Sequence, residues 1–199
     1  VPNSKDLNLE LLGVETDQGG HIVINDKGQT RHKSIYAIGD VTGQPMLAHR
    51  AVHQGRQVAE VIAGKRDVVK IGEIPSVLYT DPEIAWVGET EVSLSEQGAG
   101  CQAGIFPWGA NGRSLSQGRN DGVTKIVCDP QTGKVLGGQI VGPHAGELIS
   151  EVALAIEMGA DHKAIAHTVH PHPTLCESIA MAAEDVLGEA TDLPPKVRK

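Results

Sequence analysis

The clearest indication of the fold is Val123-Thr-Lys-Ile-Val-Cys-Asp129, followed by the turn Pro130-Gln-Thr-Gly133 and the run Val135-Leu-Gly-Gly-Gln-Ile-Val141. Two short runs rich in Val and Ile, separated by a turn with Pro and Gly, are typical of paired β-strands. Three further β-like runs precede them, at residues 77–80, 83–87 and 101–107. Because strands that follow one another through tight turns pair antiparallel, we expect an antiparallel sheet.

Helical patterns flank and follow these strands. Apolar side chains recur every three or four residues in Glu147–Met158, and Asp161 is suited to cap a short helix. The expected helices cover residues 89–97, 147–158, 161–166 and 173–187, before a polar tail from about residue 189. Residues 73–199 are therefore expected to form a complete α+β domain.

The first third of the chain has a different pattern. His21–Asn25 and Ser34–Ile38 indicate two short strands, and a helix is expected from Gly43-Gln44-Pro45 to Ile62. Its apolar face would carry Ala51, Val52, Val58, Ala59 and Ile62. Residues 1–72 are too few for a doubly wound sheet. We therefore expect them to be the C-terminal end of an α/β domain that begins earlier in a longer polypeptide.

Composition excludes several classes of protein. The chain has 199 residues, a formal net charge of -8 and only 3% aromatic residues. A general nucleic-acid binder needs a basic surface and stacking side chains, so that class is not expected. No apolar run approaches the roughly 20 residues of a membrane helix. The three cysteines are far apart in the sequence, which favours free thiols and a cytoplasmic protein.

The densest group of chemically active side chains is His167-Thr-Val-His170-Pro-His172-Pro-Thr-Leu-Cys176-Glu177. Two prolines hold the backbone extended, and a helix starts directly afterwards. Three interpretations remain open: a solvated surface turn, a metal site, and an acid–base pair. In the third, Glu177 would orient the His172 imidazole as a general base. In the second, the ligands would be His167, His170, His172 and Cys176.

A second candidate site follows the run Ile35-Tyr-Ala-Ile-Gly39-Asp40. Ligands of open α/β sheets bind beyond the carboxyl ends of the strands, where Asp40 could accept a hydrogen bond from a sugar or polyol hydroxyl. The free N–H groups of the next helix, near Met46–His49, would point to the same region. The alternative is an ordinary strand-to-helix turn with a capping Asp. His49 and His53 lie one helical turn apart and are better explained as a polar face than as metal ligands.

Four motifs occur in order along the chain: Ile38–Val41, Gly43–His49, Tyr79–Gly88 and His170–Glu177. Together they resemble the C-terminal part of the pyridine nucleotide–disulfide oxidoreductase family, in particular its dihydrolipoyl dehydrogenase branch. The resemblance extends over essentially all 199 residues. It implies a flavoenzyme with an FAD domain, an NAD domain and a dimerisation domain. Residues 1–72 would end the FAD domain, and residues 73–199 would form the dimerisation domain.

The same resemblance implies roles for individual residues. Asp40 would bind the ribityl or sugar-phosphate part of FAD, and Met46, Leu47, Ala48 and His49 would lie along the flavin. His172 would be the base and Glu177 its orienting partner, and they would serve the disulfide and flavin of the other subunit of a homodimer. The reaction would pass electrons from dihydrolipoamide through a disulfide and FAD to NAD+. The lipoyl-bearing subunits of 2-oxoacid dehydrogenase complexes would be the partners.

The family's redox cysteine pair and its dinucleotide fingerprints do not occur in this stretch, so we expect it to be one part of the catalyst. Two alternatives are kept. The chain could belong to another disulfide reductase of the same fold, of the glutathione or mercuric reductase type. It could also act as a non-catalytic dimerisation module.

Overall fold

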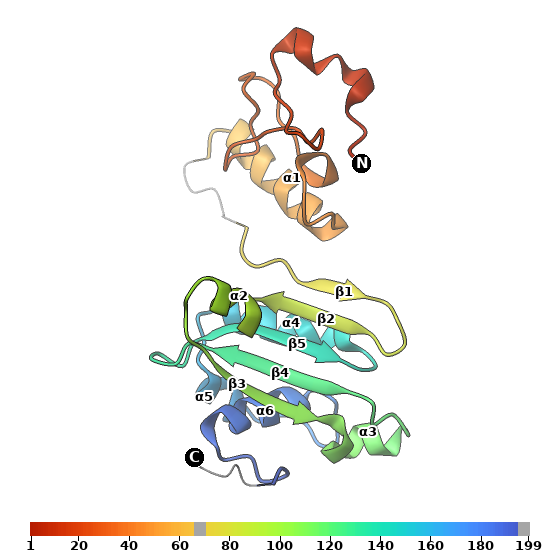
Figure 1. The fold of residues 1–199 in the computed structure, drawn as a ribbon, viewed down its shortest axis with the longest axis vertical. Coiled ribbons are helices and arrows are strands. Elements are labelled where there is room, and N and C mark those ends of the chain that lie inside the picture. The colour runs from red at the N-terminus through yellow and green to blue at the C-terminus, as the bar shows by residue number, and fades with distance from the viewer. Residues whose placement is uncertain (66–70, 195–199) are drawn as a thin grey trace. The chain divides into compact units, whose positions relative to one another are not determined.

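Five strands form one sheet in the order β1-β2-β5-β4-β3, and every neighbouring pair is antiparallel. The computed structural model describes residues 1–65 and 71–194. Those residues form two compact units, Val1–Gly72 and Glu73–Lys199, and the sheet lies in the second (Figure 1). The strands are β1 (Ser76–Leu78), β2 (Ile84–Gly88), β3 (Gln102–Pro107), β4 (Val123–Cys128) and β5 (Val135–Val141). The expected antiparallel α+β architecture is confirmed.

Two helices cover one face of this sheet, and a third packs against one of them. Figure 1 shows α4 behind β2 and β5, and α6 behind β3 and β4, with α5 beside α6. The helices of this unit are α2 (Glu91–Glu96), α3 (Gly112–Ser116), α4 (Ala145–Glu157), α5 (His162–Ala166) and α6 (Glu177–Leu187), with a 3-10 turn at Trp108–Ala110. Four of these helices were expected. The fifth, α3, was not expected: it has five residues and buries only Ser114, so the sequence shows no apolar face for it.

The core between sheet and helices is apolar and closely packed. Trp108, Phe106, Ile126, Ile140 and Ile179 are among its fully buried side chains. Close packing of side chains is what fixes one arrangement of helices on the sheet.

Two contacts set the position of α6 on β3. A Cβ on Gly104 would lie 2.0 Å from the carbonyl oxygen of Ala182, so only glycine lets the helix approach the strand this closely. Beside it, the Asp185 carboxylate on α6 accepts a hydrogen bond from the Ile105 N–H of β3 at 2.9 Å. The C-terminal half of α6 is therefore held at a defined place relative to β3.

The first unit contains one long helix, α1 (Ala48–Ile62), and 3-10 turns at Lys5–Leu7, Leu9–Leu12 and Gly39–Thr42. The expected strands at residues 21–25 and 34–38 are wrong as strands. Both segments are irregular, and only the isolated bridges Thr16–Ile22 and Gln29–Tyr36 join them to neighbouring segments. A strand needs a continuous ladder of partners, and the described residues of this unit provide only these single bridges.

The expected apolar face of α1 is also wrong in part. Val52 and Ile62 are exposed, and the side chains buried along the helix are Arg50, Gln54 and Val58. The two polar side chains are buried because they bond to the loop that precedes the helix, as described below. Among residues 1–65 and 71–194, no helix is long and apolar enough to cross a membrane.

Candidate active site

The imidazole of His172 and the carboxylate of Glu177 form a hydrogen-bonded pair at the start of α6. His172 Nδ1 lies 2.8 Å from Glu177 Oε1, and the other oxygen, Oε2, accepts the backbone N–H of Thr174 at 2.7 Å. Both carboxylate oxygens of Glu177 therefore make a hydrogen bond. Glu177 orients the ring, and it closes the turn between Pro173 and the helix.

This geometry determines which ring nitrogen can act as a base. A carboxylate only accepts hydrogen bonds, so Nδ1 of His172 carries the N–H and Nε2 carries the lone pair in the neutral ring. The His172 side chain is 76% exposed, whereas that of Glu177 is 14% exposed. The arrangement is an accessible imidazole held by a mostly buried carboxylate, which is suited to proton transfer.

The metal-site interpretation has no support in the geometry. Within the described parts of the chain, no group of three or more His, Cys, Asp or Glu side chains is placed to hold a metal ion. His170 instead bonds to Glu151, with Nε2 2.7 Å from Oε1. The Sγ of Cys176 lies 3.0 Å from the hydroxyl of Thr174.

A buried polar chain lies beneath the His172–Glu177 pair. The indole N–H of Trp108 donates to Thr124 Oγ1 at 2.9 Å, and Thr124 Oγ1 lies 2.8 Å from Ser178 Oγ. All three side chains are fully buried. Since Ser178 follows Glu177 directly, this chain ties the first turn of α6 to β4. None of these residues was singled out from the sequence, because their spacing carries no local signal.

The second candidate site lies in the first unit. Asp40 is exposed within the 3-10 turn that begins at Gly39. Gly39 has φ +70°, and a Cβ there would lie 3.0 Å from the Cβ of Ala51. Its N–H donates to the buried side-chain oxygen of Gln54 at 2.7 Å. The hydrogen bond to Gln54 and the absence of a side chain on Gly39 therefore let the turn that carries Asp40 lie close to α1.

Most residues around the start of α1 are exposed, and the N–H of Met46 donates to Oε1 of Gln44 at 3.1 Å. Leu47 is the N-cap and supplies no side-chain hydrogen bond, and Met46, Ala48 and His49 are exposed. The guanidinium of Arg50, which is mostly buried, donates to the carbonyl oxygens of Gly43 and Pro45 and to the hydroxyl of Thr42. An exposed carboxylate beside the N-terminus of a helix suits a ligand with hydroxyl groups and an acceptor edge, as FAD has. Arg50 and Gln54 were missed from the sequence, although their four-residue spacing places them on one face of α1.

The structure brings His172 and Glu177 together, and it places Asp40 and Met46–His49 in a different unit. His49 and His53 are both exposed on α1, which agrees with a polar face.

Two family models match the chain. The model described as pyridine nucleotide-disulphide oxidoreductase, dimerisation domain, matches residues 74–183, and the model described as pyridine nucleotide-disulphide oxidoreductase matches residues 1–55. The first match alone covers more than half of the chain.

Curated relatives agree with these models. The chain is 48% identical over 194 residues to dihydrolipoyl dehydrogenase of Vibrio cholerae, and this alignment covers 98% of the chain and 41% of the relative. It is 45% identical over 181 residues to the mitochondrial dihydrolipoyl dehydrogenase of Homo sapiens, covering 91% of the chain and 36% of the relative. The chain thus spans about two fifths of the length of these relatives.

Solved structures share the fold. LpdA from Mycobacterium tuberculosis superposes with a TM-score of 0.86 at 32% identity, covering 92% of this chain and 40% of that one. The HOCl-induced flavoprotein disulfide reductase RclA from Escherichia coli gives a TM-score of 0.84 at 24% identity, covering 92% and 42%, and supports the fold alone. The sheet, its covering helices and the family models lead to one assignment: the chain belongs to the pyridine nucleotide–disulphide oxidoreductase family.

Proposed function

We propose that this chain is the C-terminal part of a flavoprotein disulfide oxidoreductase that oxidises dihydrolipoamide to lipoamide, with NAD+ as the final acceptor. The observation that carries the proposal is the exposed His172 imidazole, which is oriented through Nδ1 by Glu177 at 2.8 Å. Similarity to dihydrolipoyl dehydrogenases along 98% of the chain supports the choice of substrate.

His172 would remove the proton from a thiol of the substrate. Thiolate, and not thiol, attacks a disulfide, and a thiol with a pKa of about 8.5 is mostly protonated at neutral pH. Nε2 of His172 would take that proton, and the Glu177 carboxylate would stabilise the resulting imidazolium. The turn closed by Thr174 and Glu177 would keep the ring in place during the transfer.

The residues proposed to bind FAD are Asp40, Met46, Leu47, Ala48 and His49. The Asp40 carboxylate would accept hydrogen bonds from hydroxyl groups of the ribityl or sugar-phosphate part, and the N–H groups at the start of α1 would face the flavin edge. FAD, when bound, supplies the two-electron chemistry between the disulfide and NAD+. No residue of this chain is assigned to NAD+.

We further propose that residues 73–199 pair two copies of the protein. The exposed His172 of one copy would then complete the site of the other, and lipoyl-bearing subunits of 2-oxoacid dehydrogenase complexes would deliver the substrate. The match of residues 74–183 to a dimerisation-domain model supports this pairing. Residues 1–72 would be the end of the FAD-binding domain.

The test is single-turnover reduction of the flavin by dihydrolipoamide in the complete protein that contains this chain. His172→Gln should bind FAD normally and slow this step by about 10²–10⁴, because Gln cannot take up a proton at neutral pH. His170→Gln is the matched control and should react at close to the native rate. Equal rates for His172→Gln and the native protein would disprove the assignment of the base.

A further inference from the structure

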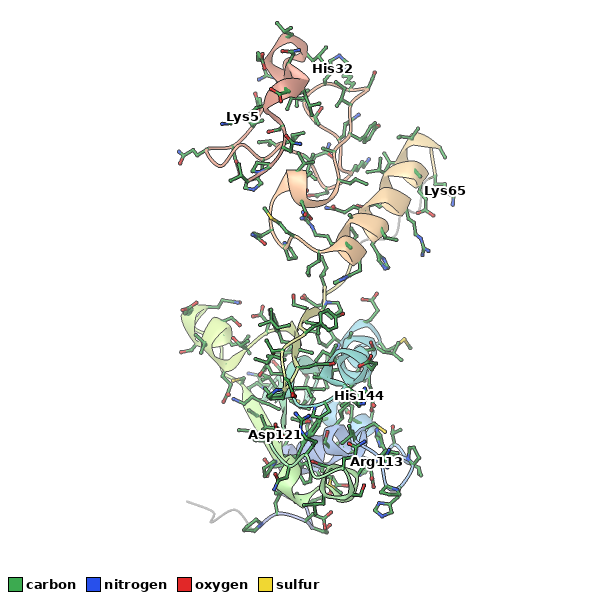
Figure 2. All side chains as sticks on the ribbon, turned by 90° about the vertical axis from the view of Figure 1, so that its right-hand side faces the viewer. Lys5, His32, Lys65, Arg113, Asp121 and His144 are labelled. Atoms are coloured by element: carbon green, nitrogen blue, oxygen red, sulfur yellow. The ribbon has the colours of Figure 1, made fainter. Side chains whose placement is uncertain are left out.

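Asn111 is a fully buried amide that bonds to two separate segments of the second unit. It is only 1% exposed and lies immediately before α3, the short helix on which Figure 2 labels Arg113. Its Nδ2 donates to the carbonyl oxygen of Thr174 at 3.0 Å, and its Oδ1 accepts the N–H of Ser114 at 2.9 Å. Only one orientation of the amide satisfies both partners, since the carbonyl needs a donor and the N–H needs an acceptor.

Both backbone groups of Thr174 are therefore hydrogen-bonded to side chains. Its carbonyl oxygen accepts from Asn111, and its N–H donates to Oε2 of Glu177. The other oxygen of Glu177 binds the His172 ring. Three consecutive hydrogen bonds therefore connect the buried amide of Asn111 to the exposed imidazole.

The start of α3 also borders the ring itself. A Cβ built on Gly112 would lie 3.8 Å from Cε1 of His172 and 3.9 Å from Cβ of Pro173, which is ordinary van der Waals contact. Gly112 therefore lies close to the imidazole, with room for one added carbon between them.

We infer that Asn111 is a positioning residue for the His172–Glu177 pair, an inference that rests on the proposed role of His172 as base. Capping α3 requires only an acceptor for the Ser114 N–H, which Ser or Asp also supplies. The specific property of Asn111 is its second function, a buried N–H donor that reaches Thr174, 63 positions away in the sequence. Without that donor, the Thr174 carbonyl loses its partner and the turn can shift relative to α3. A displacement of the His172 ring by a fraction of a hydrogen-bond length is enough to slow proton transfer.

Two variants remove the donor while they keep the cap. Asn111→Ser retains a capping oxygen but is too short to reach Thr174. Asn111→Asp retains the shape and the cap, and it places an oxygen where Nδ2 was. The matched control is Ser114→Ala, which removes the hydrogen bond from the buried Ser114 Oγ to the Arg119 carbonyl but leaves both bonds of Asn111 intact.

The first readout is independent of activity. In the ¹⁵N-His NMR spectrum of the full chain, which has nine histidines, His172 should be present as the Nδ1–H tautomer in the native protein and in Ser114→Ala. Both Asn111 variants should give a mixture of the two tautomers. An unchanged His172 signal in folded Asn111→Ser or Asn111→Asp would overturn the inference, and so would an equal change in Ser114→Ala.

The second readout is flavin reduction by dihydrolipoamide in the complete protein. The Asn111 variants should be slower by about tenfold to a hundredfold, with Ser114→Ala unchanged. If His172→Gln had no effect on this rate, the proposed base would be wrong, yet the NMR result would still decide whether Asn111 positions the ring. If His172→Gln were slow and the Asn111 variants fast, only the inference on Asn111 would be wrong.

Discussion

His170 and His172 are two positions apart in the chain, yet their rings bind different carboxylates and differ strongly in burial. His170 Nε2 lies 2.7 Å from Glu151 on α4, and its ring is 7% exposed. His172 Nδ1 lies 2.8 Å from Glu177 on α6, and its ring is 76% exposed. The Nδ1 of His170 also lies 2.8 Å from the carbonyl oxygen of Thr168. Both nitrogens of His170 are therefore engaged within its own unit, which indicates a structural role.

Replacing the two histidines by alanine should separate stability from activity. His170→Ala should lower the free energy of unfolding by about 1–3 kcal/mol, because it removes a nearly buried ring together with its hydrogen bonds to Glu151 and Thr168. His172→Ala should lower it less, because the His172 ring is 76% exposed and the Glu177 carboxylate keeps the N–H of Thr174 as a partner. Urea denaturation of the chain measures both values. A larger loss for His172→Ala than for His170→Ala would contradict the structural role.

Glu177→Gln should slow flavin reduction by less than His172→Gln does. The amide has one acceptor oxygen for two donors, the Nδ1–H of His172 and the N–H of Thr174, so orientation is lost while the imidazole remains. The same stopped-flow experiment compares the two variants in the complete protein. A slower rate for Glu177→Gln than for His172→Gln would show that the carboxylate does more than orient the ring.

Leu154→Glu should weaken self-association of the chain. Leu154 on α4 and Met158, which directly follows α4, are exposed apolar side chains, and Val169 is exposed beside His170. A stable interface buries on the order of 1,000 Å² or more, and a charge at its centre is costly. Sedimentation velocity at micromolar concentration should show a dimer for the native chain and a monomer for the variant. Lys163→Glu, at an exposed position of α5, is the control for added charge. A variant that stays dimeric would exclude this face of α4.

Cys128 should resist alkylation in the folded chain. Burial raises the pKa of its thiol to about 12, and the negative charge of Asp161 adds to the effect, so little thiolate exists near neutral pH. Iodoacetamide at about pH 8 should modify Cys101 and leave Cys128 intact, with all three cysteines modified in urea. The folded state holds the proton that the unfolded thiol releases near its ordinary pKa of 9.0. Stability should therefore fall as the pH rises from there toward 12. Rapid labelling of Cys128 without unfolding would contradict its burial.

Sequence patterns were sufficient for the elements with strong local signals. The turn at Pro130–Gly133 between two β-like runs predicted the β4–β5 pair, and apolar spacing predicted α4. The approach of His172 to Glu177 also follows from local geometry, because a proline-stiffened segment runs directly into the first turn of a helix. Such features depend only on residues that are close to one another in the sequence.

The same kinds of pattern gave wrong predictions in the first unit. Short apolar β-like runs at 21–25 and 34–38 predicted strands, but a strand forms only where a neighbouring ladder satisfies its backbone. Likewise, the apolar side chains of α1 predicted its buried face, while hydrogen bonds of Arg50 and Gln54 to the preceding loop decided which side is buried.

What the sequence determined by itself was the succession along the chain of the five strands and of α2, α4, α5 and α6, and the local pairing at the start of α6. Tertiary structure alone decided the contacts of Asn111 with Thr174 and of Glu151 with His170. These partners are 63 and 19 positions apart, so no spacing rule joins them. They meet because the sheet register and the close approach of α6 at Gly104 place each helix at one position on the sheet. Polar groups buried by that packing then need partners, whichever segments supply them.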